Sequence, residues 1–312
     1  MSRRASLALA ALLASLALAC GRSAPQSREG FVDVPGGRAW YRIVGSGSRP
    51  PLLLVHGGPG AGSCYFSAIT ALADERPVVL YDQLGSGRSD RPSDPSLWRI
   101  DRFVQELAAI RTALRLDRVH LLGHSWGAAV VAEYLLNSNA TGIESVIFAG
   151  PLLSTPRWIA DANLLLTELP ETVQQVIATN EQRGTTSSPE YQKATEVFYS
   201  RFLFHHQPAP TFPECPFNQA VYEQMWGPTE FHATGNLRAF DRASRLTEIR
   251  APVLFIVGRF DEARVQTVTD FQRLIPGSTL EVVEGAGHMA MVDEPARYTQ
   301  ALRSFLQHLE NH

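Results

Sequence analysis

The chain has 312 residues, of which 45% are hydrophobic and 19% are charged, and its formal net charge is −3. This length provides for one large domain, or for a core with an inserted subdomain, and the composition is that of a globular protein, which excludes a disordered chain and a coiled coil. The chain is mildly acidic and has no run of Lys and Arg, so it lacks the basic segment that would favour a nucleic-acid partner.

The N-terminus predicts export. Met1–Arg4 is basic, and Ala5–Ala19 contains only Ala, Leu and Ser, an apolar stretch too short to span a bilayer as a mature helix. The residues that end in Ala19-Cys20-Gly21 resemble a bacterial lipoprotein signal, in which the cysteine becomes the lipidated first residue. Ordinary signal cleavage is the alternative, because alanine stands where that signal usually has leucine. We expect a signal peptide over 1–19, a polar tether over 20–30, a lipid anchor at Cys20 and a periplasmic or cell-envelope location.

Apolar runs then alternate with helical patterns. Val32–Val34 and Ala39–Val44 flank a Pro-Gly-Gly turn and predict a β-hairpin. Leu52–Val55 and Val78–Tyr81 are continuous apolar runs, typical of strands buried on both faces. From Asp101, apolar residues recur at helical spacing. The alternation predicts an α/β fold with a mainly parallel sheet flanked by helices.

The loop His56-Gly57-Gly58-Pro59-Gly60 follows the first of these buried strands. Because it is nearly free of side chains, its backbone N–H groups can approach a ligand closely. We expect Gly58 to supply one half of an oxyanion hole. A phosphate-binding loop is the weaker alternative, since no Gly-Lys-Ser/Thr ending follows.

Gly123-His124-Ser125-Trp126-Gly127 is the strongest motif in the chain. An apolar strand pattern precedes it and a helical pattern follows it, which is the context of a nucleophile elbow. The strained turn presents Ser125 to a substrate, and the flanking glycines avoid collisions there. We expect Ser125 to be a nucleophile and the N–H of Trp126 to be the second half of the oxyanion hole.

A serine nucleophile needs a general base and a group that orients the base. His288 follows a strand pattern over Thr279–Val283, and Asp261 follows one over Pro252–Val257. Both therefore lie at carboxyl ends of strands, where α/β sheets place their chemistry. The order Ser125, Asp261, His288 matches the order of a triad after a nucleophile elbow. When each residue is considered alone, the alternative is that His288 is an ordinary loop histidine and that Asp261 caps the following helix.

Two cysteines remain after Cys20. Cys64 and Cys215 form a disulfide or stay as buried free thiols, and the sequence leaves both open. Histidines and cysteines do not cluster at metal-ligand spacing, so we predict no metal and no cofactor.

Four motifs resemble the proline iminopeptidase (prolyl aminopeptidase) family of α/β-hydrolases, which includes the tricorn-interacting aminopeptidases. They are the segments His56–Gly60, Tyr81–Ser89, Gly123–Gly127 and Gly227–Phe231. The resemblance implies an α/β-hydrolase fold and release of an N-terminal residue, often proline, from peptides, amides or arylamides.

Residues 151–240 separate two halves of the core, 31–150 and 241–312, and are poor in continuous apolar runs, so we expect an inserted helical lid. The resemblance implies that two lid glutamates, Glu230 and Glu196, bind the substrate's α-amino group by charge-assisted hydrogen bonds. Phe202 stands where the family often has histidine, and 204–217 is rich in proline. The preferred N-terminal residue therefore stays open.

Two other functions stay open as well. One is an esterase, lactonase or amidase that uses the same triad. The other is a non-catalytic binding lipoprotein, against which an intact triad argues. The sequence does not indicate the oligomeric state.

Overall fold

The structure, a computed structural model, describes residues 26–138 and 140–311. The expected signal peptide and the lipidated Cys20 lie outside the described residues. Within those ranges, none of the helices has the length and apolar character needed to cross a membrane.

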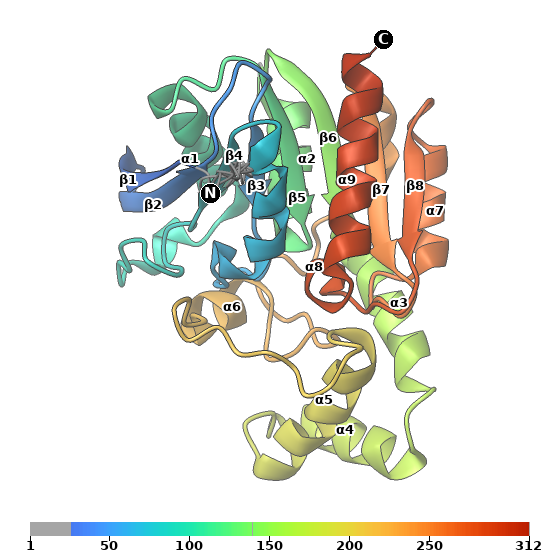
Figure 1. Ribbon diagram of the computed structural model, residues 1–312. Helices are drawn as coiled ribbons and strands as arrows, with labels where there is room; N and C mark the ends of the chain where they lie inside the picture. Colours follow the sequence, from blue (N-terminus) through green and yellow to red (C-terminus); the bar gives the residue numbers. More distant parts are fainter. Residues whose placement is uncertain (1–25, 139, 312) are drawn as a thin grey trace, which may run out of the picture.

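Eight strands form one sheet in the order β1-β2-β4-β3-β5-β6-β7-β8 (Figure 1). The strands are β1 (Ser27–Val34), β2 (Gly37–Val44), β3 (Leu52–Val55), β4 (Val78–Tyr81), β5 (Val119–His124), β6 (Ile143–Ala149), β7 (Val253–Gly258) and β8 (Thr279–Val283). The pairs β1–β2 and β2–β4 are antiparallel, and all other pairs are parallel. The predicted mainly parallel sheet is therefore confirmed.

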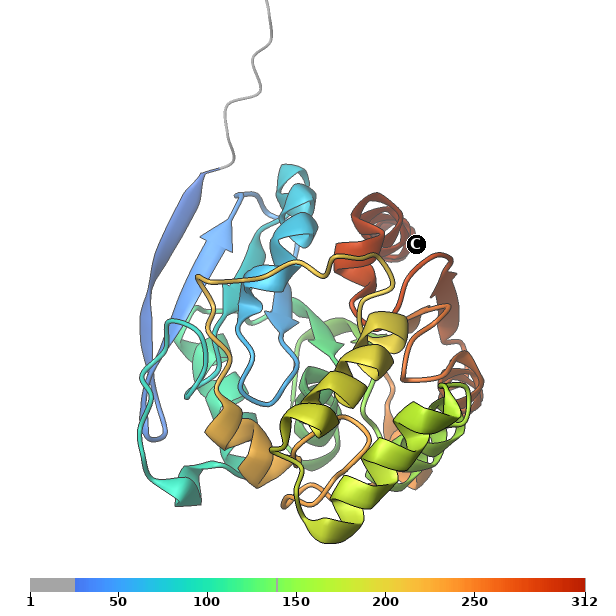
Figure 2. The same cartoon turned by 90° about the horizontal axis from the view of Figure 1, so that it is seen from below.

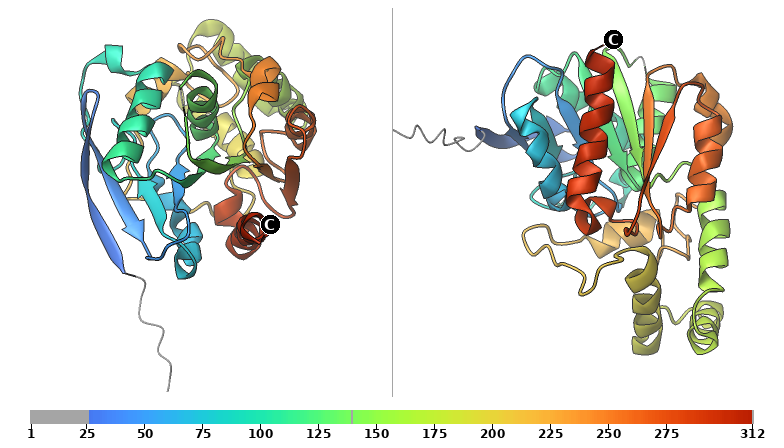
Figure 3. Two further views of the ribbon diagram at one scale, coloured as in Figure 1. Left: turned by 90° about the horizontal axis from the view of Figure 1, so that it is seen from above. Right: turned by 45° about the vertical axis from the view of Figure 1, so that its right-hand side comes forward.

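Helices cover both faces of the sheet. The helical segments of the core are η1 (Ser63–Asp74), η2 (Pro95–Leu97), α1 (Ile100–Ala113), α2 (Trp126–Asn137), η3 (Ala243–Glu248), α7 (Val265–Arg273), α8 (Ala290–Asp293) and α9 (Pro295–Glu310). Alternate residues of β3 enter opposite layers: Leu53 and Val55 pack with α1 and α2, whereas Leu52 and Leu54 pack with η1 and α9. Figure 1 and the view from above in Figure 3 show these two layers. Because both faces are covered, the central strands consist of unbroken apolar runs.

Four helices lie between β6 and β7 in the chain. They are α3 (Thr155–Leu166), α4 (Glu171–Arg183), α5 (Pro189–Phe202) and α6 (Gln219–Met225). They cover the carboxyl edge of the sheet, opposite the C-terminal end of α9 (Figures 1 and 2), and α4 and α5 project beyond it (Figure 3, right). The inserted segment has a small apolar core of its own, which includes Leu165, Ile177, Phe198 and Phe231.

The expected tether over 20–30 is too long by at least four residues. Ser27–Gly30 belongs to β1, where Ser27 pairs with Val44 and Gly30 pairs with Tyr41. These positions are polar because β1 is an edge strand with exposed side chains. Composition alone therefore could not distinguish this part of the strand from a linker.

Candidate active site

Ser125 lies in the turn between β5 and α2. Its backbone has φ 54° and ψ −121°, a region that costs a non-glycine residue about 1–3 kcal/mol. A Cβ at Gly123 would stand 2.5 Å from the carbonyl oxygen of Gly127, and one at Gly127 would stand 2.0 Å from that of Val55. The turn therefore tolerates only glycine at these two positions. The Ser125 N–H donates to the Ala149 carbonyl (2.9 Å), which holds the elbow against β6.

His288 and Asp261 form a buried pair. Nδ1 of His288 and Oδ1 of Asp261 lie 2.7 Å apart, and the Ala263 N–H donates to the same oxygen at 2.7 Å. Burial by itself lowers the pKa of His288, but the charge and hydrogen bond of Asp261 and the charge of Glu230 outweigh it, so that the pKa is raised above its usual 6.5. Because Asp261 occupies Nδ1, Nε2 is the nitrogen available to a substrate.

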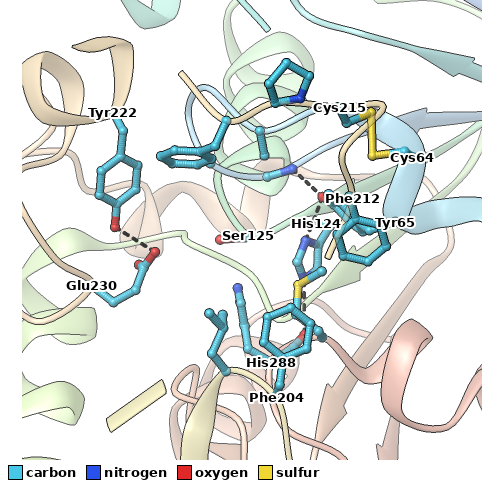
Figure 4. Close-up of a pocket in the computed structure, with 18 residues that line it drawn as sticks. Cys64, Tyr65, His124, Ser125, Phe204, Phe212, Cys215, Tyr222, Glu230 and His288 are labelled. Atoms are coloured by element: carbon cyan, nitrogen blue, oxygen red, sulfur yellow. Dashed lines mark hydrogen bonds between the residues drawn. A yellow bond between two sulfur atoms is a disulfide. The ribbon is translucent and has the colours of Figure 1, made fainter. Parts of the chain in front are cut away.

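Ser125 and His288 line one cavity of about 360 Å³. Figure 4 shows the His288 side chain pointing toward Ser125 from the opposite wall. Gly58 and Glu230 line the same cavity. The remaining wall is largely apolar and includes Leu203, Phe204, Phe212, Phe217 and Met289. Asp261 stands behind His288, so three residues from separate segments meet at the carboxyl edge of the sheet.

Hydrogen bonds on both sides of Gly57 fix the loop that contains Gly58. The Gly57 N–H donates to the hydroxyl of Tyr65 (2.6 Å), and Nδ1 of His56 lies 2.9 Å from the Gly57 carbonyl oxygen. In a trans peptide the carbonyl and the following N–H point in opposite directions, so this second contact also sets the direction of the Gly58 N–H. Gly58 has φ +110°, which favours glycine.

Trp126 is the first residue of α2, where backbone N–H groups have no partner within the helix. Its indole N–H donates to Oε1 of Gln83 (2.9 Å), and Nε2 of Gln83 donates to the carbonyl oxygen of His56 (2.7 Å). Gln83 therefore connects the elbow to the loop after β3. The connection joins the motifs His56–Gly60 and Gly123–Gly127, each of which contains one of the two expected oxyanion donors.

Glu230 reaches the cavity from the inserted segment. Tyr222 of α6 donates to its Oε1 (2.7 Å), and the indole of Trp158 in α3 donates to its backbone carbonyl (3.1 Å). Removal from water raises the pKa of Glu230, an effect that the Tyr222 hydrogen bond and the charge of His288 counteract. Two other helices of the insert thus hold Glu230: α6 through its carboxyl group and α3 through its backbone.

Glu262 is a second carboxyl group at this place, and our sequence analysis missed it. Its side chain is fully buried, and neither carboxylate oxygen has a hydrogen-bond partner among the described residues. Its Oε1 lies 3.9 Å from Nε2 of His288. Burial, and then the charges of Glu230 and Asp261, raise the pKa of Glu262 well above the usual range. The one signal in the sequence was its place directly after Asp261.

Glu196 lies elsewhere, contrary to expectation. It is exposed on α5 and lines a neighbouring cavity that shares Glu230 with the first, but it does not line the cavity of Ser125. The buried face of α5 is formed by Tyr191, Ala194 and Phe198. Glu196 falls between these positions on the helix and points away from that core.

Cys64 and Cys215 form a disulfide with a Cα–Cα distance of 6.2 Å, which decides the question that the sequence left open. Both cysteines line the cavity, so the bond connects η1 of the core to the inserted segment at the site itself (Figure 4). Over the described ranges, no three His, Cys, Asp or Glu side chains gather to hold a metal ion.

Known proteins are similar to this chain over most of its length. The pattern of the alpha/beta hydrolase fold family matches residues 50–295, which defines the class of the protein. Proline iminopeptidase of Heyndrickxia coagulans is 46% identical over 284 residues, which cover 89% of this chain and 98% of the relative. The chain therefore belongs to the proline iminopeptidase family of α/β-hydrolases, and it is a serine hydrolase of the prolyl aminopeptidase type.

Two solved structures are similar over most of the chain. The crystal structure of VinJ has a TM-score of 0.85 at 32% identity and covers 90% of this chain and 99% of its own. That of proline iminopeptidase from Mycobacterium smegmatis has a TM-score of 0.81 at 31% identity, with 90% and 98% covered. The predicted fold class is thereby confirmed.

Proposed function

We propose that the enzyme releases one N-terminal residue from small peptides, amides or arylamides through an acyl-enzyme on Ser125. The observation that carries this proposal is the carboxyl group of Glu230, which lines the cavity of Ser125, together with a second carboxyl group, Glu262, buried beside His288. Glu262 is fully buried, Glu230 is partly buried, and their negative charges oppose one another. Such a pair of carboxyl groups favours a positively charged ligand.

The spacing supports an exopeptidase. In an amino acid the α-nitrogen lies about 2.5 Å from the carbonyl carbon. A carbonyl that is attacked by Ser125 lies close to Nε2 of His288, and Glu262 Oε1 is 3.9 Å from that nitrogen. We therefore expect the amine of the residue being released to lie near Glu230, which lines the cavity. The amine of a longer N-terminal extension would lie beyond it.

The proposed chemistry follows from these positions. Ser125 Oγ forms a bond to the carbonyl carbon while its proton passes to Nε2 of His288, and Asp261 holds the imidazole in place. The backbone N–H groups of Gly58 and Trp126 stabilise the oxyanion. The C–N bond then breaks, and His288 gives the proton to the leaving amine. Water attacks the acyl-enzyme by the same route and releases the free amino acid.

The residue released is proposed to be proline or another small apolar residue. With the amine at the two glutamates, the side chain or ring faces apolar surface formed by residues such as Phe204, Phe212 and Met289. This wall has no charged group to pair with a cationic or anionic side chain.

The location of the enzyme is part of the proposal. A basic start and a short apolar stretch before Cys20 favour export and lipidation, as argued from the sequence. The disulfide between Cys64 and Cys215 is consistent with an oxidising compartment. Mass spectrometry of the mature N-terminus tests this point, and an unmodified start at or after Gly21 would exclude the anchor.

A panel of aminoacyl-arylamides tests the function. We expect hydrolysis of Pro- and Ala-arylamides with free amines, loss of activity in Ser125→Ala, and at most slow hydrolysis of the N-acetylated substrates. Equal hydrolysis of free and acetylated forms would contradict the exopeptidase. Fast hydrolysis of short p-nitrophenyl esters that Glu230→Gln leaves unchanged would favour an esterase.

A further inference from the structure

His124, within the nucleophile elbow, has no part in the mechanism above although it touches the catalytic histidine. It is 2% exposed, and its ring centroid lies 4.6 Å from that of His288. Tyr65 of η1 meets it from the other side, with ring centroids 5.4 Å apart in an edge-on arrangement. Both residues line the cavity.

Three hydrogen bonds run through these residues in one direction (Figure 4). The Gly57 N–H donates to the Tyr65 hydroxyl at 2.6 Å. That hydroxyl lies 3.0 Å from Nδ1 of His124, and Nε2 of His124 lies 3.2 Å from the backbone carbonyl oxygen of His288. A carbonyl only accepts, so Nε2 of His124 must carry the hydrogen. In the neutral ring Nδ1 is then the acceptor, and Tyr65 donates its single proton to it.

We infer that Tyr65 and His124 are positioning residues, which hold the oxyanion loop and the backbone of His288 in a fixed relation to one another. This inference rests on the proposed function, because it assigns the two ends of the hydrogen-bonded chain to the oxyanion hole and the general base. One end is the peptide next to Gly58, and the other is the peptide of His288. Through His124 the elbow itself lies between them.

The arrangement requires His124 to stay neutral. A protonated ring would carry hydrogen on both nitrogens, so Nδ1 could no longer accept from Tyr65. It would also place a second positive charge beside His288 whenever that residue takes the proton of Ser125. The titratable groups that face His124 are Tyr65 from η1, His288 from the loop after β8 and His56 from the loop after β3. Burial, and then the charge of His288, hold the pKa of His124 well below its usual value.

The chain offers matched controls. His120 is four positions earlier in β5, equally buried, and lies with Nδ1 2.7 Å from the hydroxyl of Ser145, outside the cavity. Tyr298 is buried in α9, and its hydroxyl has no hydrogen-bond partner in the part of the chain that the structure describes. His120→Phe and Tyr298→Phe therefore report the general effect of such substitutions in the core.

The decisive comparison is between two substitutions of one residue. His124→Phe keeps a ring and removes both hydrogen bonds, whereas His124→Gln keeps an acceptor and a donor. We expect His124→Phe and Tyr65→Phe to lower kcat for Pro-arylamide by roughly 10- to 100-fold, the range that a displacement of about 1 Å produces. KM should stay within about twofold, because Glu230 and Glu262 are untouched, and His124→Gln should recover most of kcat.

The experiment measures kcat, KM and Tm for all five variants together with Ser125→Ala. A kcat of His124→Phe equal to that of His120→Phe would overturn the inference, as would an equal loss in His124→Gln and His124→Phe at the same Tm. If His124→Phe does not fold, Tyr65→Phe is compared with its control Tyr298→Phe instead. Equal kcat values for these two variants would overturn the inference. Full activity of Ser125→Ala would instead contradict the proposed function, so that the two failures are distinguishable.

Discussion

Oε1 of Glu262 lies 3.9 Å from Nε2 of His288, although Glu262 directly follows the aspartate that binds the other nitrogen of the same ring. Two adjacent carboxyl groups thus face opposite sides of one imidazole. Asp261 accepts hydrogen bonds from two N–H groups, whereas Glu262 is fully buried and lacks a hydrogen-bond partner within the described ranges. Under the proposed function, the α-amino group of the substrate supplies a positive charge that stabilises such a carboxyl group.

Replacing either carboxyl group should weaken the binding of the substrate amine. For Glu262→Gln and Glu230→Gln we expect kcat/KM for Pro-arylamide to fall roughly 10- to 100-fold, the value of one charge-assisted hydrogen bond. Glu196→Gln is the matched control, because Glu196 is exposed and outside the cavity. Steady-state kinetics check this. Equal effects of all three substitutions would contradict the assignment.

On the acid limb of the pH profile, the reaction rate should fall with a midpoint above 6.5, the usual pKa of histidine. His288 must be neutral to accept the proton of Ser125, so the rate falls as pH drops through its pKa, which is raised above 6.5. The negative charge of Glu230 contributes to that rise. Glu230→Gln should therefore move the limb to lower pH. A short p-nitrophenyl ester, which has no amine to titrate, is the substrate for this measurement, and a limb that stays in place would contradict the coupling.

Gly150 limits the space around the pair formed by His288 and Asp261. A Cβ there would stand 2.8 Å from Nδ1 of His288 and 2.9 Å from Oδ2 of Asp261, at φ +46°. We expect Gly150→Ala to displace one of the two side chains and to lower kcat by about 100-fold or more. Gly184, with φ +66° and no atom of the described chain within 4 Å of its would-be Cβ, provides the control. Gly184→Ala should lower stability by about 1 kcal/mol and leave kcat unchanged.

The disulfide should stabilise the protein measurably. It connects residues 151 positions apart, and closing a loop of that size restricts the unfolded chain. Loss of the bond is expected to lower the free energy of unfolding by about 2–5 kcal/mol. Denaturant titration with and without a thiol reductant tests this in the wild type. The double variant Cys64→Ser, Cys215→Ser should have the lower free energy of unfolding both with and without the reductant. If the reductant still destabilised this variant, the disulfide would not explain the effect.

Much of the fold and of the candidate triad could be predicted from the sequence, because both depend on local patterns. Continuous apolar runs such as Leu52–Val55 identify strands that are buried on both faces. The Gly-x-Ser-x-Gly motif marks Ser125. Chemistry in such a sheet lies where strands end, so Asp261 and His288 could be proposed from their places after strands and from their order in the chain. Glu230 was found by its motif, and in the structure it lines the cavity with Ser125.

Only the tertiary structure decided which side chains from distant parts of the sequence contact one another, because no local sequence pattern indicates such contacts. Glu196 lies in α5 and Glu262 lies three residues before α7. Only folding buries Glu262 against His288 and leaves Glu196 in solvent. The same holds for Cys64 and Cys215, and for the chain of hydrogen bonds through Tyr65 and His124. Periodicity reports which face of an element is apolar, whereas burial and distance depend on how separate elements pack. The charge and direction of the side chains in the site follow from that packing.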